Sequence, residues 1–246
     1  MHALTRITKS EWTLLLREPT AVFFLLGFAP LLLIILGLVP SFREASEDLG
    51  GLRVIDLYTP IIITMSIAML ALQALPQTFA TYREQGVLRR MATTPARPAM
   101  MLGGQLIMFG LVSFAVMVLV QGIGVFAFDV PVPRSIPVYL LAYLLSVASM
   151  LSIGLLVAAV ARGGKAAGAI GSVLFFPVLF FAGLWVPREG MSAILRRISD
   201  FTPLGAGVQS LSDAAAGHWP QLLHVAVMLV WTVGAGAVAA RFFRWE

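Results

Sequence analysis

Six long stretches without a charged residue are the feature of this sequence that most restricts its fold. They comprise residues 19–42, 57–82, 98–128, 135–161, 166–187 and 214–240. Each is longer than the roughly 20 residues that a helix needs to cross about 30 Å of hydrocarbon. None shows the period-2 alternation that a membrane β-barrel requires. The sequence therefore predicts an all-α polytopic membrane protein, in which residues 1–246 form one transmembrane domain of six helices.

The composition excludes a soluble fold and several kinds of chemistry. Hydrophobic residues make up 59% of the chain and charged residues only 12%, whereas roughly a quarter of the residues in a soluble domain are charged. The chain has no cysteine, so disulfides, thiolate metal sites and cysteine nucleophiles are excluded. The first apolar stretch is too long for a signal peptide and lacks a clear cleavage site.

Charge predicts the orientation in the membrane. An even number of spans places both termini on one side, and placing them in the cytoplasm puts eleven of the 17 Lys and Arg residues inside. This distribution satisfies the positive-inside rule. We therefore expect a protein of the plasma (inner) membrane with cytoplasmic termini, and we interpret the net charge of +5 as a sign of topology. A nucleic-acid partner is not expected.

Residues 1–19 precede the first span and are expected to form an amphipathic helix in the cytoplasmic interface. Arg6, Lys9 and Arg17 share one arc of a helical wheel, while Trp12 lies among apolar residues on the rest. Basic residues at anionic headgroups and a tryptophan at the boundary are typical of interfacial helices. The alternative is a frayed basic leader.

The loop at residues 82–98 joins the second and third spans and has the sequence YREQGVLRRMATTPARP. Its first half is expected to form about two helical turns before Pro95 ends the helix. This short helix would then present apolar side chains, flanked by charges, that could fit a hydrophobic cavity on a soluble partner. The apolar residues are Val87, Leu88 and Met91. The alternative is an ordinary cytoplasmic loop whose arginines only oppose translocation.

Residues 188–213 lie outside in this topology and carry apolar residues at helical spacing on both sides of Pro203. This pattern is typical of an external helical hairpin that re-enters the membrane, where its apolar faces would be covered by protein. A plain interfacial helix explains the pattern equally well.

Catalytic signatures are missing from the sequence. Gly163, Gly164 and Lys165 resemble a phosphate-binding loop, but Ala166 stands where that loop needs Ser or Thr. The histidines form no zinc-binding pair, and no span carries a central carboxylate of the kind that proton relays use. We therefore expect no catalytic residue, no metal site and no cofactor on this chain.

Polar amides and an unusually aromatic fifth span are the candidates for a solute path. The amides also fit hydrogen bonds between helices, and the aromatic residues also fit lipid contact. The candidates are Gln73, Gln121, Phe176 and Phe180. A stripe of small residues, Gly164, Gly168 and Ser172, fits either packing within the chain or a subunit interface that moves.

Two stretches resemble type-2 ABC exporter permeases, particularly the membrane subunit of the daunorubicin exporter. The loop carries that family's pattern at Glu84, Gly86, Leu88, Arg89, Thr94 and Pro95. The stretch FFAGLWVPREGMSAILRRISDFTPL resembles the end of the family's fifth span and the external helices that follow, with Gly183, Pro187 and Pro203 in matching places. The six-span layout and the N-terminal helix extend the resemblance over essentially the whole chain.

This resemblance implies a permease subunit that exports an amphipathic or lipid-linked solute, such as a drug or antibiotic, and so gives resistance. It implies a second permease copy, identical or a close paralogue, and a separate nucleotide-binding subunit that holds ATP and Mg. The N-terminal helix and the loop would contact that subunit, the loop through Arg83, Glu84, Gly86, Val87, Leu88, Arg89, Arg90 and Met91. The alternatives are an intramembrane enzyme or a non-transport immunity or assembly protein.

Overall fold

The computed structural model describes residues 8, 12–13, 16–46, 51–87 and 98–242. Within them, six helices are long and apolar enough to cross a membrane, which confirms the predicted all-α polytopic fold. The first span comprises α2 (Pro19–Val22), η1 (Phe23–Gly27) and α3 (Phe28–Gly37), and the second comprises α4 (Val54–Ala68), η4 (Met69–Ala74) and α5 (Leu75–Glu84). The others are α7 (Pro98–Phe128), α8 (Ile136–Val160), α9 (Gly164–Ala182) and α12 (Leu222–Phe242).

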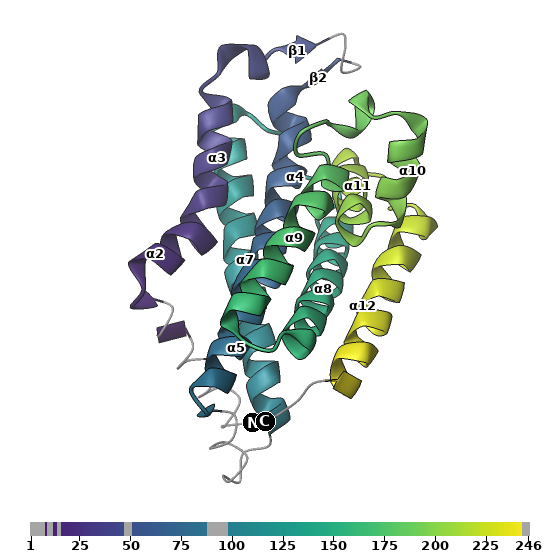
Figure 1. The fold of residues 1–246 in the computed structure, drawn as a ribbon. Helices are drawn as coiled ribbons and strands as arrows, with labels where there is room; N and C mark the ends of the chain where they lie inside the picture. The colour runs from purple at the N-terminus through teal and green to yellow at the C-terminus, as the bar shows by residue number, and fades with distance from the viewer. Residues whose placement is uncertain (1–7, 9–11, 14–15, 47–50, 88–97, 243–246) are drawn as a thin grey trace.

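The second span forms the centre of the bundle (Figure 1). It packs against α3 and α7 on one side and against α8 and α9 on the other. In its most apolar window 72% of the residues are buried, against 22% in the first span and 22% in the fifth. The first and fifth spans therefore present most of their surface to lipid or to another protein.

The loop after the first span contains a short hairpin that the sequence did not predict. After the 3-10 turn η2 (Pro40–Phe42), β1 (Ala45–Ser46) pairs antiparallel with β2 (Leu52–Arg53). Arg53 forms a salt bridge of 2.7 Å with Asp56 in the first turn of α4, and its guanidinium donates to the carbonyl of Asp129 at 2.8 Å. One side chain thus ties the start of the second span to the end of the third.

The chain after α9 forms helices at the end of the bundle opposite α5 (Figure 1). They are η5 (Arg188–Gly190), α10 (Ala193–Phe201) and α11 (Pro203–Ala216). Thr202 caps α11 by accepting the backbone N–H of Gly205 at 3.1 Å, and residues 203–208 of α11 are all buried. Re-entry of this segment into the membrane stays a prediction.

Three predicted span boundaries were wrong. The last span begins at Leu222 rather than at residue 214, because Gly217 adopts the left-handed conformation (φ +90°) and ends α11 there. The first span ends at Gly37 rather than at residue 42, since the chain turns into η2 at Pro40. The fifth span ends at Ala182 rather than at residue 187, because Gly183 is left-handed (φ +95°). In all three places the uncharged stretch extends beyond the helix, so charge alone could not locate the boundary.

Candidate functional site

The first and second spans each contain a π-helical turn shortly before a proline. η1 precedes Pro30, and η4 precedes Pro76. A proline has no N–H to donate to the carbonyl four residues earlier, which for Pro76 is that of Leu72. A π turn is wider than an α turn and can accommodate this missing hydrogen bond. Such π turns are frequent at functional sites.

Two glycines pack directly on the backbone of η4. A Cβ atom at Gly154 of α8 would collide with the carbonyl oxygen of Ala71, and one at Gly171 of α9 would collide with that of Leu72. Only glycine allows this approach, in which Cα–H groups face carbonyl oxygens. The small residues of α9 at this level therefore serve packing within the chain.

Arg83 and Glu84, the last two residues of α5, bind the turn between α8 and α9. The Arg83 guanidinium donates to the carbonyl of Ala161 at 2.7 Å and to that of Ala158 at 3.2 Å. The Glu84 carboxylate accepts the backbone N–H of Gly164 at 2.7 Å. We refer to Arg83 and Glu84 as the cap pair.

The cap pair matches the polarity of both helix ends. The last carbonyls of a helix and its first N–H groups have no partner within the helix, and they carry partial negative and positive charge respectively. The Arg83 guanidinium lies at the negative end of α8, and the Glu84 carboxylate lies at the positive end of α9. A Cβ atom at Gly163 would lie 2.8 Å from the Glu84 carboxylate, so this approach favours glycine there.

The loop begins directly after the cap pair. α5 ends at Glu84, and Gly86 has a φ of +66°, in the left-handed region. A Cβ atom there would meet nothing within 4 Å, so the conformation rather than space favours glycine. The short helix predicted in the loop thus does not begin at Arg83, because the helix of the second span continues through both residues of the cap pair before the chain turns.

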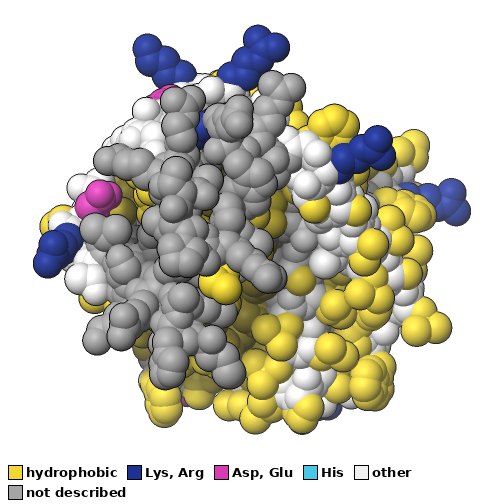
Figure 2. Space-filling view, turned by 90° about the horizontal axis from the view of Figure 1, so that it is seen from below, with side chains coloured by type: hydrophobic (Ala, Val, Ile, Leu, Met, Phe, Trp, Pro, Cys, Tyr) yellow, Lys and Arg dark blue, Asp and Glu magenta, His cyan; other side chains and the backbone are white. Residues whose placement is uncertain are grey.

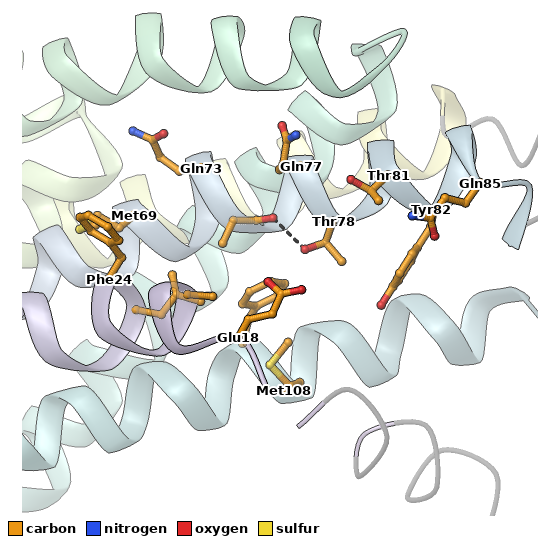
Figure 3. A pocket seen from close by; sticks show the side chains of 14 residues that line it. Glu18, Phe24, Met69, Gln73, Gln77, Thr78, Thr81, Tyr82, Gln85 and Met108 are labelled. Atoms are coloured by element: carbon orange, nitrogen blue, oxygen red, sulfur yellow. Dashed lines mark hydrogen bonds between the residues drawn. The ribbon is translucent and has the colours of Figure 1, made fainter. Parts of the chain in front are cut away.

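A groove of about 730 Å³ lies beside the second span (Figure 3). Its volume is within the roughly 300–1,000 Å³ of small-molecule sites. Its walls come from the start of the first span, from η4 and α5, and from α7, and both π turns contribute. The lining residues are Glu18, Ala21, Phe24, Leu25, Met69, Gln73, Ala74, Gln77, Thr78, Thr81, Tyr82, Gln85, Met108 and Phe109. We refer to this cavity as the amphipathic groove.

A cluster of charged side chains fastens the opposite end of the bundle. Asp200 of α10 forms a salt bridge of 2.6 Å with Arg188 and lies 3.0 Å from Nε2 of His224 on α12. His224 is only 1% exposed. Burial raises the pKa of Asp200, but the hydrogen bonds of Arg188 and His224 outweigh it and leave that pKa lowered. Burial raises the pKa of the nearby Asp213.

The family model described as ABC-2 type transporter matches residues 2–215. The chain belongs to the ABC-2 type transporter family. Two relatives are the inner membrane transport permeases YhhJ of Escherichia coli (strain K12) and of Shigella flexneri, each 27% identical over 206 residues. The aligned region covers 75% of this chain and 54% of each relative, so the chain spans about half the length of the curated relatives it matches.

Family membership confirms the resemblance read from the sequence. The family is one of membrane transport proteins, and the relatives are described as transport permeases of the inner membrane. Members of the family generally work in the membrane together with an ATP-binding subunit.

The residues predicted to contact the ATP-binding subunit are only partly within the described structure. Arg83 and Glu84 bind the α8–α9 turn, while Gly86 and Val87 follow at the start of the loop. Contact of these residues with a partner stays a prediction. Leu88, Arg89, Arg90 and Met91 lie outside the described residues.

The N-terminal residues are divided in the same way. Trp12 is half-buried and packs against the main hydrophobic core, and Arg17 is exposed just before the first span. Arg6 and Lys9 lie outside the described residues. The interfacial helix therefore stays a prediction.

The residues predicted to line a solute path do not come together. Gln73 lines the amphipathic groove. Gln121 accepts from Tyr139 at 3.4 Å, a bond between α7 and α8. Phe176 is 58% exposed and packs against Trp185 with ring centroids 6.3 Å apart, while Phe180 packs edge-on against its neighbour Phe181. Apart from Gln73, these contacts fit helix pairing and surface exposure.

Sequence reasoning missed the groove residues that lie nearest to the cap pair. Gln77, Thr81 and Gln85 follow Gln73 at intervals of four residues and line the groove with it. That spacing places them on one face of a helix, and it was readable in the sequence.

Proposed function

We propose that this ABC-2 permease is the membrane subunit of an exporter driven by ATP that a separate nucleotide-binding subunit hydrolyses. The cap pair is the observation that carries the proposal. It lies at the end of the central span, at the start of the segment 82–98, and it binds the ends of two other spans. ATP and Mg would be held by the partner subunit.

The cap pair gives the loop a mechanical connection to three spans. A displacement of the loop by the partner would pull on α5, and the backbone bonds of Arg83 and Glu84 would carry that pull into α8 and α9. Because η4 packs backbone to backbone on the same two helices, the second, fourth and fifth spans would move as one unit. A flexible connection at this point would absorb the displacement of the loop instead of passing it to α8 and α9.

Charge at the α5 end supports a cytoplasmic position for the loop. Viewed from that end, Lys and Arg side chains project around the rim of the molecule (Figure 2). The exposed basic residues beside the span ends are Arg17, Arg162, Lys165 and Arg241. A cytoplasmic excess of Lys and Arg is the usual pattern, and we infer cytoplasmic termini from it.

A second permease copy, identical or a close paralogue, would cover the exposed side of the fifth span. α9 is among the least buried spans, and Gln77 is exposed beside its small residues, with its amide 3.6 Å from the Cβ position of Gly168. An amide at this depth is costly in lipid. The exported solute would be amphipathic or lipid-linked, such as a drug or antibiotic, and its removal would confer resistance.

The competing functions lack support in the described residues. An intramembrane enzyme needs converging nucleophiles or carboxylates within the spans, and the part of the chain that the structure describes holds no group of three His, Cys, Asp or Glu able to bind a metal. An immunity or assembly role would not require the bonds between α5 and the α8–α9 turn.

Co-purification tests the proposal. The intact chain is purified from its native membranes, and we expect it to bring with it an ATP-binding cassette protein whose ATPase activity responds to the permease. Substituting Gly86 with proline should abolish that response while membrane insertion is kept, because proline cannot adopt a φ of +66°. Failure of any ATPase to associate with the intact chain would reject the proposed function.

Orientation is tested separately with single cysteines, since the natural chain has none. A cysteine at Arg162 should be labelled only after the membrane is permeabilised, and a cysteine at Glu189 should be labelled from outside. The opposite pattern would reject cytoplasmic termini.

A further inference from the structure

We propose that the amphipathic groove binds a cationic amphiphile, with its charged group against Glu18 and its apolar part between Phe24, Met69 and Phe109. The inference deepens the exporter function, on which it rests for its biological role, by naming the class of solute. Binding itself is a property of this chain and can be measured without the partner subunit.

Glu18 has a carboxylate that the described structure does not otherwise use. It is the N-cap residue of α2, where an acidic side chain would normally accept the first N–H groups of the helix. Its side chain makes no cap hydrogen bond, and no ion pair joins it to any described residue. The carboxylate instead faces the groove, beside Met108 (Figure 3).

The lining selects the sign of the ligand's charge. Of the 14 residues that line the groove within the described chain, Glu18 is the only one with a charged side chain. Arg83 is close in sequence, but its guanidinium binds α8 carbonyls instead. A groove with one carboxylate and no described cation attracts a monovalent cation and repels an anion.

The groove is polar at one end and apolar at the other. Gln77, Thr81 and Gln85 lie towards the end of α5, whereas Phe24 and Met69 lie at the opposite end (Figure 3). Met69 and Gln85 are separated by about 24 Å along the helix at 1.5 Å per residue. A ligand with a charged head at Glu18 and a hydrophobic body towards Phe24 and Met69 matches this gradient.

A second cavity shows that this polarity is specific to the groove. It has a volume of about 500 Å³ between α8, α9 and α12, and it is lined almost entirely by apolar side chains such as Ile153, Leu174 and Val178. Such a cavity suits lipid chains without regard to charge. The groove differs because a carboxylate residue and several amide residues are among those that line it.

The groove also contacts the elements that the proposed mechanism moves. One wall is η4 and α5, which carry Pro76 and end in the cap pair. The facing wall includes Phe24 and Leu25 of η1, the π turn of the first span. A ligand between the two π turns would therefore be released when the second span moves relative to the first.

The test uses tetraphenylphosphonium, a permanent lipophilic cation, and tetraphenylborate, an anion of nearly the same shape. The full chain is placed in nanodiscs of zwitterionic lipid, and binding to empty nanodiscs is subtracted. Because the two ions precipitate together, each is titrated separately. We expect saturable binding of the cation and no saturable binding of tetraphenylborate. Glu18→Gln should weaken cation binding about tenfold, since it removes the one described charge that lines the groove.

Two variants complete the design. Glu189→Gln removes an exposed carboxylate far from the groove and should leave cation affinity unchanged. Ala21→Phe places a ring in the groove and should abolish saturable binding with an unchanged Tm. Wild-type affinity in Glu18→Gln or in Ala21→Phe, or equally tight saturable binding of the anion, would overturn the proposal.

The outcomes separate this inference from the exporter function. Loss of cation specificity with an intact ATPase complex would reject the solute class and leave the exporter function standing. Glu18-dependent cation binding by a chain that recruits no ATPase would support the groove and reject the exporter function.

Discussion

The two ends of the bundle are fastened by opposite kinds of contact. At the α5 end, the charged side chains of Arg83 and Glu84 bind backbone groups at the ends of α8 and α9. At the α10 end, the side chains of Arg188 and His224 each bind the carboxylate of Asp200. The first arrangement depends on helix geometry and the second on protonation. Movement should therefore be transmitted at the α5 end, while pH should act at the α10 end.

Between the two ends, uncharged contacts should contribute the most stability. Gly171→Val would force a side chain against the carbonyl of Leu72. Because a backbone carbonyl inside a packed bundle cannot move aside, we expect a loss of about 3 kcal/mol. Unfolding in mixed micelles measures it, and Gly234→Val is the control, since a Cβ atom there meets nothing within 4 Å. Equal losses in both variants would contradict the close packing of η4.

Asp200→Asn should cost about 1–2 kcal/mol near neutral pH, because it removes a charged acceptor from Arg188 and His224. The pKa of Asp200 is lowered in the folded protein. Its contribution is therefore present above the ordinary value of 3.8 and is lost as the pH falls through the lowered folded-state pKa.

A series of Tm values against pH measures this effect. The Tm difference between wild type and Asp200→Asn should shrink as the pH falls through the folded-state pKa of Asp200. Asp213 acts in the opposite direction, since its raised pKa favours folding only while it is protonated. The matched variant Asp213→Asn should therefore not reproduce the pattern. A difference for Asp200→Asn that stays constant with pH would contradict the titrating role of this cluster.

Glu84→Ala should have the smallest effect on stability, about 1 kcal/mol, which is typical for the loss of a helix N-cap. Its effect on function should be large, because the bond to Gly164 would no longer carry movement into α9. Glu84→Gln keeps an acceptor oxygen and should retain part of the ATPase response. Full activity in Glu84→Ala would remove the cap pair from the mechanism.

The sequence was sufficient for the architecture because each span is defined by local composition. An uncharged, apolar stretch of about 20 residues directly indicates a membrane-spanning helix. The bounds of α7 and α8 were therefore predicted almost to the residue. The start of α12 was not, since Gly217 and the helix before it lie within the same uncharged stretch. The hairpin of β1 and β2 is too short to leave a pattern.

The site was less predictable because its contacts join distant parts of the chain. Glu84 was recognised from a motif, but its bond to Gly164 spans 80 residues and cannot be inferred from one sequence. The pair Gly163 and Gly164 was compared only with a phosphate loop, although glycines between two helical patterns also mark a helix boundary. The place of Glu18 in the groove could be recognised only in the structure, where residues of the first span and of α5 line the same cavity.

The central claim is that the loop and the α8–α9 turn move together because the cap pair joins them. Spin labels at Gln85 and Arg162, both exposed, would report their separation in the complex with the ATPase subunit. We expect one narrow distance distribution that ATP does not change, and a broad, ATP-dependent one after Glu84→Ala. A distance that changes with ATP in the intact protein, or one that stays narrow in Glu84→Ala, would contradict the claim.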